Sequence, residues 1–310
     1  MAYYKKAYKR RLSFGQGSNA LITLIAINLV IFVIFIFIEA IFYLRYEKKE
    51  EAIAAFNNNV LSWFTLPADI DKIGARPWTI ITHMFLHTGF WHVFANMLWL
   101  WTFGYIMQDL TGNKKIFPVF IYGALAGALA FVLAYNFLPA LKPQLLVQSA
   151  LGASAGIMAI AVAATMVAPG YRIFPMLGGG IRLWILTTIY IIIDLATIPV
   201  RNPGGHIAHL AGALMGVLFI YFFRKGYDWG KWMNDLFDWF NDLFNPDKPK
   251  KRKSVKQELF YKSSAPPYKK TPNVTEQRID EILDKISQKG YNSLNEEEKE
   301  LLKRASETDR

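Results

Sequence analysis

Long runs of apolar residues alternate with short polar breaks over the first two thirds of the chain. The clearest run extends from Ala20 to Tyr43 and holds one acidic residue, Glu39, near its end. Five further runs follow, at residues 90–108, 116–138, 150–168, 183–199 and 206–223. A helix rises about 1.5 Å per residue and a bilayer core is about 30 Å thick, so each run can cross, the shorter ones narrowly. The pattern predicts an all-α membrane domain of six spans over residues 20–224.

Basic residues at the ends of these runs indicate how the spans are oriented. Residues 1–19 carry five of them, namely Lys5, Lys6, Lys9, Arg10 and Arg11. By the positive-inside rule this N-terminal segment lies in the cytoplasm. The pairs Lys114-Lys115 and Arg172/Arg182 then fall on the same side, and six crossings return the C-terminal tail there. The segment 45–89 is assigned to the outside, although it carries five Lys or Arg.

Charge divides the chain into two unlike parts. Residues 1–224 hold 17 Lys or Arg and 8 Asp or Glu, whereas residues 225–310 hold 18 and 16. An N-terminal part so apolar and so poor in charge excludes a simple soluble protein. Membrane flanks and a basic tail explain the net charge of +11, so no nucleic-acid partner is expected. The chain has no Cys, which excludes disulfides, thiolate metal sites and a Cys nucleophile.

The tail predicts three further segments. Residues 225–247 favour an amphipathic helix on the inner membrane surface, because apolar residues recur every three or four positions. These residues are Trp232, Met233, Leu236, Phe237, Phe240, Leu243 and Phe244. Residues 248–273 are expected to form a basic flexible linker whose Lys248 to Lys253 stretch meets anionic headgroups. Residues 274–310 predict a small helical hairpin with Ser293 and Glu296 as a capping box, and its partner is left open.

Candidate chemistry gathers at the outer ends of the predicted spans. The five histidines lie in two short stretches there and are His83, His87, His92, His206 and His209. Ionisable groups at membrane depth are costly and usually face a cavity. Because spans two, four and six run in the same direction, His92, Ser154 and His209 are expected at similar depth. A Ser and a His brought together there, away from bulk water, could act as nucleophile and general base.

Helix spacing adds to this expectation. His92 and Asn96 are four residues apart, so they share a helix face and could point two donors at one place, as an oxyanion hole needs. His209, Gly212 and Gly216 also share one face. The two glycines remove side-chain bulk beside the histidine, which would let the sixth span press against the fourth. Gly152 and Gly156 are expected to do the same from the fourth span.

Three motifs occur in a fixed order along the chain. They are His83-x3-His87-x4-His92-x3-Asn96, Gly152-Ala-Ser154, and Ala208-His209-Leu-Ala-Gly212-Ala-Leu-Met-Gly216. Together with Arg76-Pro77-Trp78-Thr79 before the first, they resemble the motifs of the rhomboid family of intramembrane serine proteases. The resemblance covers about residues 18–224. It implies a six-helix bundle whose site opens to the extracytoplasmic face through a water-filled depression.

The resemblance also implies roles for individual residues. Ser154 would be the nucleophile and His209 the base of a dyad without a third acid, and His92, Asn96 and the Ser154 N–H would stabilise the oxyanion. No metal and no cofactor are implied. The segment 45–89, with Trp63, Phe64, Trp78 and Phe85, would lie half in the membrane beside the site. Substrates would be single-span membrane proteins, cut near or within the helix at a small residue.

Some residues of the motifs are expected to support the site or to modify it. Gly152, His87, His206 and Gly212 are assigned supporting positions, and His83 and His87 are expected to form structural hydrogen bonds in the first loop. Asp194 could be offered as a third acid, but capping or anchoring its own helix is preferred. The family commonly has Gly directly after the serine, whereas this chain has Ala155. Activity is expected to be retained, with a changed substrate preference.

Other functions compete with this interpretation. A non-proteolytic rhomboid relative that binds membrane proteins is the main alternative, although such relatives usually lack the Ser or the His. A metal carrier would use the histidines, yet no acidic or thiolate partner set accompanies them. A channel or carrier would favour internal repeats, and none is found. The absence of Cys and the short N-terminus favour a bacterial inner membrane.

Overall fold

The computed structural model describes residues 19–174, 176, 179–243 and 276–308. The chain divides into two compact units, residues 1–244 and residues 245–310. The predicted N-terminal segment 1–19, apart from Asn19, and the predicted linker 248–273 lie outside the described residues.

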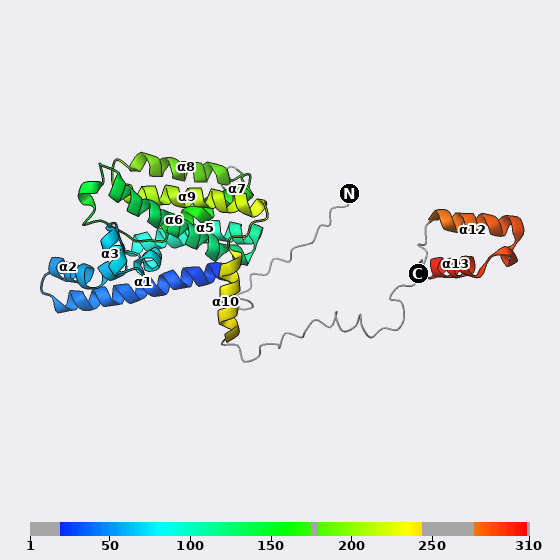
Figure 1. Cartoon of the computed structure of the whole chain (residues 1–310), viewed down its shortest axis with the longest axis horizontal. Coiled ribbons are helices and arrows are strands. Elements are labelled where there is room, and N and C mark those ends of the chain that lie inside the picture. The colour runs from blue at the N-terminus through cyan, green and yellow to red at the C-terminus, as the bar shows by residue number, and fades with distance from the viewer. Residues whose placement is uncertain (1–18, 175, 177–178, 244–275, 309–310) are drawn as a thin grey trace. The chain divides into compact units, whose positions relative to one another are not determined.

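In the described part of the first unit, six helices of 14 residues or more form a bundle (Figure 1). They are α1 (Ala20–Arg45), α5 (Phe90–Thr111), α6 (Ile116–Phe137), α7 (Ser154–Val167), α8 (Leu183–Thr197) and α9 (Pro203–Arg224). Each falls within one of the six apolar runs or extends it by a few residues. Three of them are long and apolar enough to cross a membrane, in spans at Ala20–Arg45, Asn113–Phe137 and Pro203–Arg224, and α7 and α8 are shorter apolar helices. α5 has 22 residues but carries polar groups such as His92 and Asn96 along its length.

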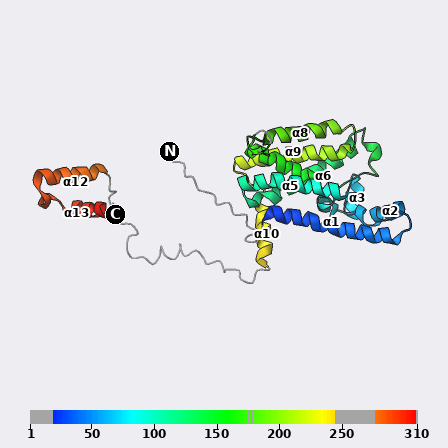
Figure 2. The same cartoon turned by 180° about the vertical axis from the view of Figure 1, so that it is seen from behind.

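α7 is the most enclosed of these helices, because ten of its 14 residues are buried. It packs against α5, α6 and α9. α1 lies at one edge of the bundle and α8 at the opposite edge, beside α9, as Figures 1 and 2 show from both sides. Both edge helices expose large apolar side chains, for example Phe37 on α1 and Ile192 on α8. Such exposure suits helices that face lipid, where apolar side chains bear no cost.

Small residues bring α9 against α7. A methyl group added at Gly212 would lie 2.2 Å from the carbonyl oxygen of Ala155, and one at Gly216 would lie 2.4 Å from that of Ala159. The structure thus shows the predicted approach of the sixth span to the fourth. The expectation for the other two glycines was wrong. Gly156 faces Phe120 of α6, because a helix as enclosed as α7 turns small residues toward several neighbours. Gly152 lies before α7 begins and faces the ring of His92.

The segment between α1 and α5 is not a plain loop. It contains α2 (Lys49–Asn59), α3 (Ile70–Ala75) and α4 (Thr79–Thr82), with short 3-10 turns at Leu61–Trp63 and His83–Phe85. Trp63 and Trp78 stack with 6.4 Å between ring centroids, and each is 44% exposed. Phe85 instead points inward, against Phe120. The aromatic residues predicted to lie in the membrane are therefore divided between the surface and the core.

Two short antiparallel strand pairs correct the all-α expectation. β1 (Leu66–Pro67) pairs with β2 (Ser149–Ala150), and β3 (Arg172–Ile173) pairs with β4 (Ile181–Arg182). The first pair joins the segment 45–89 to the chain that leads into α7, with Leu66 opposite Ala150. The amide of Asn136 on α6 donates to the carbonyl of Ala68, which holds the same segment to the bundle. Backbone pairing of this kind satisfies polar groups that would otherwise be exposed to an apolar environment.

α10 (Lys231–Leu243) lies within residues 225–247, the segment predicted to be an amphipathic helix, and runs across the axes of the bundle helices (Figure 1). Trp232, Leu236 and Trp239 are each more than half exposed. The indole N–H of Trp232 donates to the hydroxyl of Tyr122 on α6 at 2.7 Å. This orientation and this exposed apolar face suit a helix lying along a membrane surface. The side chains of Phe237, Phe240, Leu243 and Phe244 lie outside the described residues.

The second unit is a helical hairpin of α12 (Glu276–Lys289) and α13 (Glu296–Thr308), joined by a 3-10 turn at Tyr291–Ser293. Its buried residues are Ile282, Leu294 and Leu301. The predicted capping box was placed two residues too early. Asn295 and Glu298 form it, since each backbone N–H donates to the other's side chain, at 2.9 and 2.8 Å. Ser293 instead donates to the carbonyl of Gly290.

Candidate active site

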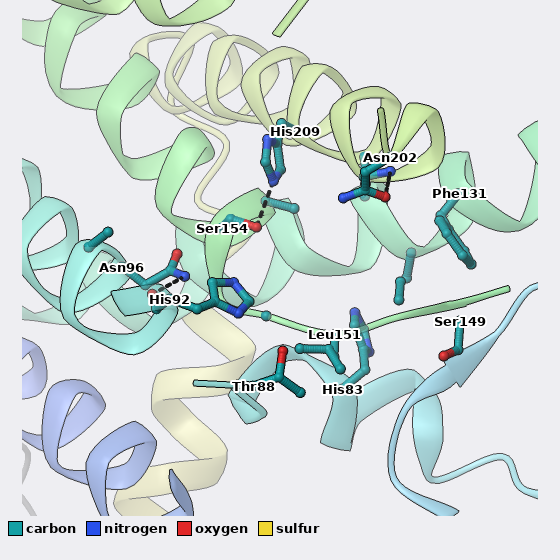
Figure 3. Close-up of a pocket in the computed structure, with 18 of the residues that line it drawn as sticks. His83, Thr88, His92, Asn96, Phe131, Ser149, Leu151, Ser154, Asn202 and His209 are labelled. Carbon is teal, nitrogen blue, oxygen red and sulfur yellow. Dashed lines mark hydrogen bonds between the residues drawn. The ribbon is translucent and has the colours of Figure 1, made fainter. Parts of the chain in front are cut away.

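Ser154 and His209 are in direct contact (Figure 3). Ser154 is the first residue of α7, and His209 lies on α9. The serine hydroxyl lies 2.7 Å from the Nε2 atom of the histidine, so the O–H can donate to the ring. Both side chains are partly exposed to a cavity of about 430 Å³. The structure therefore brings together the predicted nucleophile and the predicted base.

Gly152 sets the approach of the chain to Ser154. Its φ of 121° lies in a region that residues with a Cβ rarely adopt, and a Cβ there would stand 3.2 Å from the His92 ring. Its N–H donates to the carbonyl of His83 at 2.9 Å. Glycine is thus required for both conformation and space, which gives a physical reason for the supporting position assigned to it.

His92 and Asn96 lie on one face of α5 and line the same cavity as Ser154 (Figure 3). The Asn96 amide donates one hydrogen to the carbonyl of His92 at 2.9 Å, and an amide has a second to offer. The first N–H groups of α7 have no acceptor within the helix, and the positive end of its dipole lies at Ser154. Donors on α5 and at the N-terminus of α7 therefore line the cavity that holds the serine.

His83 lines the cavity and His87 lies beside His92; both precede α5 and are 5% exposed. The ring of His83 donates to the carbonyl of Thr79, as expected of a structural group. The same expectation was wrong for His87. Neither of its ring nitrogens has a hydrogen-bond partner among the described residues, and the ring instead packs edge-on against His92 at 5.1 Å.

Burial dominates the ionisation of these two rings. It lowers the pKa of His83 from 6.5 to about 4. Burial, together with the neighbouring His92, lowers the pKa of His87 from 6.5 to about 4 as well. Both rings are therefore neutral at physiological pH.

Asp194 makes a contact that sequence reasoning missed. It lies on α8, and its Oδ1 atom is 2.9 Å from Nδ1 of His209 and 2.6 Å from Nδ1 of His206. These contacts join α8 to α9 and reach the predicted base, so Asp194 does more than cap its own helix. The spacing of 15 residues between Asp194 and His209 carries no signal, because it depends on how α8 leans against α9.

The same three residues are the one group of His and acidic side chains, among the described residues, close enough to hold a metal ion. Their geometry fits hydrogen bonds better. Two ligands of a tetrahedral zinc ion lie about 3.3 Å apart, whereas these nitrogen–oxygen distances are 2.6 and 2.9 Å. His83 and His87 belong to separate contacts, so the metal-carrier alternative gains no support from them.

Ala155, which replaces the common glycine, is accommodated by its neighbours. A Cβ added at Gly127 of α6 would lie 2.6 Å from the Ala155 methyl group. The methyl group thus occupies the space that Gly127 leaves open, and the Ala155 carbonyl faces Gly212. The extra carbon therefore has a place in the packing of α6 against α7.

Comparison with known proteins identifies the segment that holds this site. Residues 74–226 match the family model of the Rhomboid domain. Residues 268–308 match a second model, described as a family of unknown function (DUF6576). The chain is also 32% identical over 152 residues to "Rhomboid protein 1, mitochondrial" of Saccharomyces cerevisiae, a match that covers 47% of this chain and 42% of the yeast protein.

The chain thus spans less than half of the length of this relative. By its name the yeast protein is mitochondrial, so the comparison gives no support to the expected bacterial inner membrane. The matched segment contains Ser154, His209, His92 and Asn96 and begins before the first histidine. Over residues 74–226 the chain is therefore similar to the Rhomboid domain.

Proposed function

We propose that the chain is an intramembrane serine endopeptidase in which Ser154 is the nucleophile and His209 the general base. The observation that carries the proposal is the 2.7 Å contact between the Ser154 hydroxyl and Nε2 of His209, inside a Rhomboid domain. A Ser hydroxyl is a weak nucleophile until an adjacent base takes its proton. This pair satisfies that requirement at the N-terminus of a buried helix.

The proposed reaction uses the groups that line the cavity of Ser154. The Ser154 oxygen attacks the peptide carbonyl while its proton passes to Nε2 of His209. The resulting oxyanion is stabilised by His92, Asn96 and the N–H of Ser154. His209 then gives the proton to the leaving amine, and a water molecule activated by the same ring hydrolyses the acyl-enzyme.

The substrates proposed are single-span membrane proteins, cut near the extracytoplasmic end of their helix. A Rhomboid domain implies a bundle of several membrane-crossing helices, and the apolar edge helices α1 and α8 agree with it. The orientation, with both termini in the cytoplasm, comes from the positive-inside rule. It places the cavity of Ser154 toward the extracytoplasmic face, where water can enter.

The test compares the wild type with Ser154→Ala, each purified in detergent and incubated with labelled single-span proteins that carry small residues near the outer end of the helix. Ser62→Ala is a matched control, because Ser62 lies in a surface turn and its hydroxyl only donates to the Asn58 carbonyl. Cleavage by the wild type and the control, and none by Ser154→Ala, is expected.

Cleavage that survives in Ser154→Ala would remove the serine from the mechanism. If the wild type cuts none of a varied panel, the non-proteolytic alternative, a factor that binds membrane proteins, replaces the proposal. Ala155→Gly, which restores the common residue, would then be the first variant to measure.

A further inference from the structure

A buried carboxylate lies behind the proposed base. Asp194 is 2% exposed, although it lies on α8 among apolar residues. Its Oδ1 atom accepts from Nδ1 of both His206 and His209. Its other oxygen, Oδ2, is buried without a hydrogen-bond partner among the described residues. Within that part of the chain, the two imidazoles are therefore its hydrogen-bond donors.

The burial of the Asp194 carboxylate calls for a physical explanation. Burying an ionised carboxylate in an apolar interior is unfavourable unless hydrogen-bond donors compensate it. α8 does not depend on Asp194 for its attachment to the bundle. Thr187 shares a 2.6 Å hydrogen bond with Thr165 of α7, and Tyr190 stacks on Trp99 of α5. Attachment of α8 alone thus leaves the position of the carboxylate unexplained.

The contact controls which nitrogen of His209 carries the proton. A neutral imidazole has one N–H, and its other nitrogen can only accept. When Asp194 holds a hydrogen on Nδ1, Nε2 is left as the acceptor, and Nε2 is the atom that faces the Ser154 hydroxyl at 2.7 Å. The opposite tautomer would place N–H against O–H and leave the serine without a base.

Building on the proposed function, we propose that Asp194 is a positioning residue for His209, so that a third side chain assists the Ser–His pair. The proton still moves only from the serine oxygen to Nε2 of His209 and then to the leaving amine. Asp194 takes up no proton in these steps, and its carboxylate stabilises the imidazolium that forms. His206 donates to the same oxygen and so fixes its place.

Kinetics of Asp194→Asn test the proposal in the full-length protein. We expect kcat for a single-span substrate to fall at least about 100-fold, as happens when the acid behind a catalytic histidine loses its charge, while KM changes less than about threefold. Asp109→Asn is the matched control, because Asp109 is an exposed residue near the far end of α5 from His92. Its kcat should match that of the wild type.

A spectroscopic measurement keeps the test independent of folding. The chain has five histidines, so ¹⁵N-labelled imidazoles give few signals, and His209→Gln assigns the one of interest. At neutral pH the wild-type His209 should carry its proton on Nδ1, and Asp194→Asn should shift the population toward Nε2. Protonation mainly on Nε2 in the wild type would overturn the proposal, whatever the variants do.

The two proposals fail in different ways. If Ser154→Ala abolishes cleavage but Asp194→Asn keeps kcat within about threefold of wild type, the serine protease stands and the role of Asp194 is refuted. A large loss of kcat with an unchanged tautomer would equally refute it, because the carboxylate would then act by another route. Cleavage that survives in Ser154→Ala refutes the proposed function itself.

Discussion

The α-carbon of Gly212 faces the carbonyl oxygen of Ala155, and a methyl group added there would lie 2.2 Å from that oxygen. The contact is one residue after Ser154 and three residues after His209. The distance between the serine and the histidine therefore depends on how closely these two backbones approach. A helix pair held together in this way has no space for a side chain at the contact.

Gly212→Ala should consequently separate α9 from α7 and lengthen the hydrogen bond between Ser154 and His209. We expect kcat/KM to fall more than about tenfold and the unfolding free energy to drop by about 1–3 kcal/mol. Cleavage assays and thermal unfolding in detergent measure the two effects. Gly74→Ala is the control, because a Cβ at Gly74 meets no atom within 4 Å. Full activity in Gly212→Ala would show that α9 can shift without disturbing the pair.

Exchanging the methyl group between Gly127 and Ala155 tests how this chain accommodates alanine after the serine. Gly127→Ala places a carbon 2.6 Å from the Ala155 methyl group and 3.0 Å from the Ala208 carbonyl oxygen. Gly127→Ala should therefore lower the free energy of unfolding by about 1–3 kcal/mol. Adding Ala155→Gly removes the closer clash but not the second, so the double variant should recover part of the loss in thermal unfolding.

The coupling between the two sites decides the outcome. Independent effects would add, whereas residues in contact deviate from additivity. A double variant that is as unstable as the sum of the single variants would contradict the packing of Ala155 against Gly127.

Because His83 and His87 are buried, we expect the free energy of unfolding to fall as the pH falls. Both are neutral when buried, with the pKa of each lowered from 6.5 to about 4. Between these values the unfolded chain binds protons that the folded chain does not, so stability is complete above pH 6.5 and is lost toward pH 4. A lowering of this size corresponds to about 3 kcal/mol for each ring. Thermal unfolding between pH 7.5 and pH 4.5 measures it.

His87→Leu separates the two contributions. Because neither nitrogen of His87 has a hydrogen-bond partner among the described residues, replacing the ring by leucine removes no hydrogen bond within that part of the chain. The variant should be at least as stable as the wild type at pH 5 and should show about half of the pH dependence. An unchanged pH dependence would mean that His87 does not contribute to it.

The hairpin in the tail offers a test of its own. Asn295 and Glu298 cap α13 reciprocally, and Glu298 also accepts from Lys285 of α12. Asn295→Ala should destabilise the first turn of α13 by about 1 kcal/mol. Amide hydrogen exchange of the full-length protein should detect it. Ser293→Ala, at the cap that the sequence suggested, should change the same amides much less.

The sequence predicted well whatever depends on long apolar runs and on short spacings. α1, α6 and α9 begin within four residues of the predicted spans. The Ser154–His209 contact and the common face of His92 and Asn96 also followed from depth and helical periodicity. These features depend on residues that are close along the chain, or on helices that each cross the same membrane. The local sequence is therefore enough to predict them.

Features that depend on how the helices turn and lean were not predictable. The sequence does not predict that Gly156 faces Phe120 instead of α9, because small residues occur on every face of α7 and do not mark one contact face. The contact of Asp194 with His209 depends on the rotation of α8. The pairing of Leu66 with Ala150 joins positions 84 residues apart and involves only backbone atoms, so side-chain patterns carry no trace of it.

That last pairing has a consequence for how such proteins are compared. The approach of the chain to Ser154 is fixed by hydrogen bonds between main-chain atoms, at Ser149 and Ala150 and again at Gly152. The side chain of Ser149 is exposed and that of Ala150 only half-buried, so many residue types could occupy these two positions without moving the nucleophile. A search for invariant residues would pass over these two positions, although they help to fix the position of the proposed nucleophile.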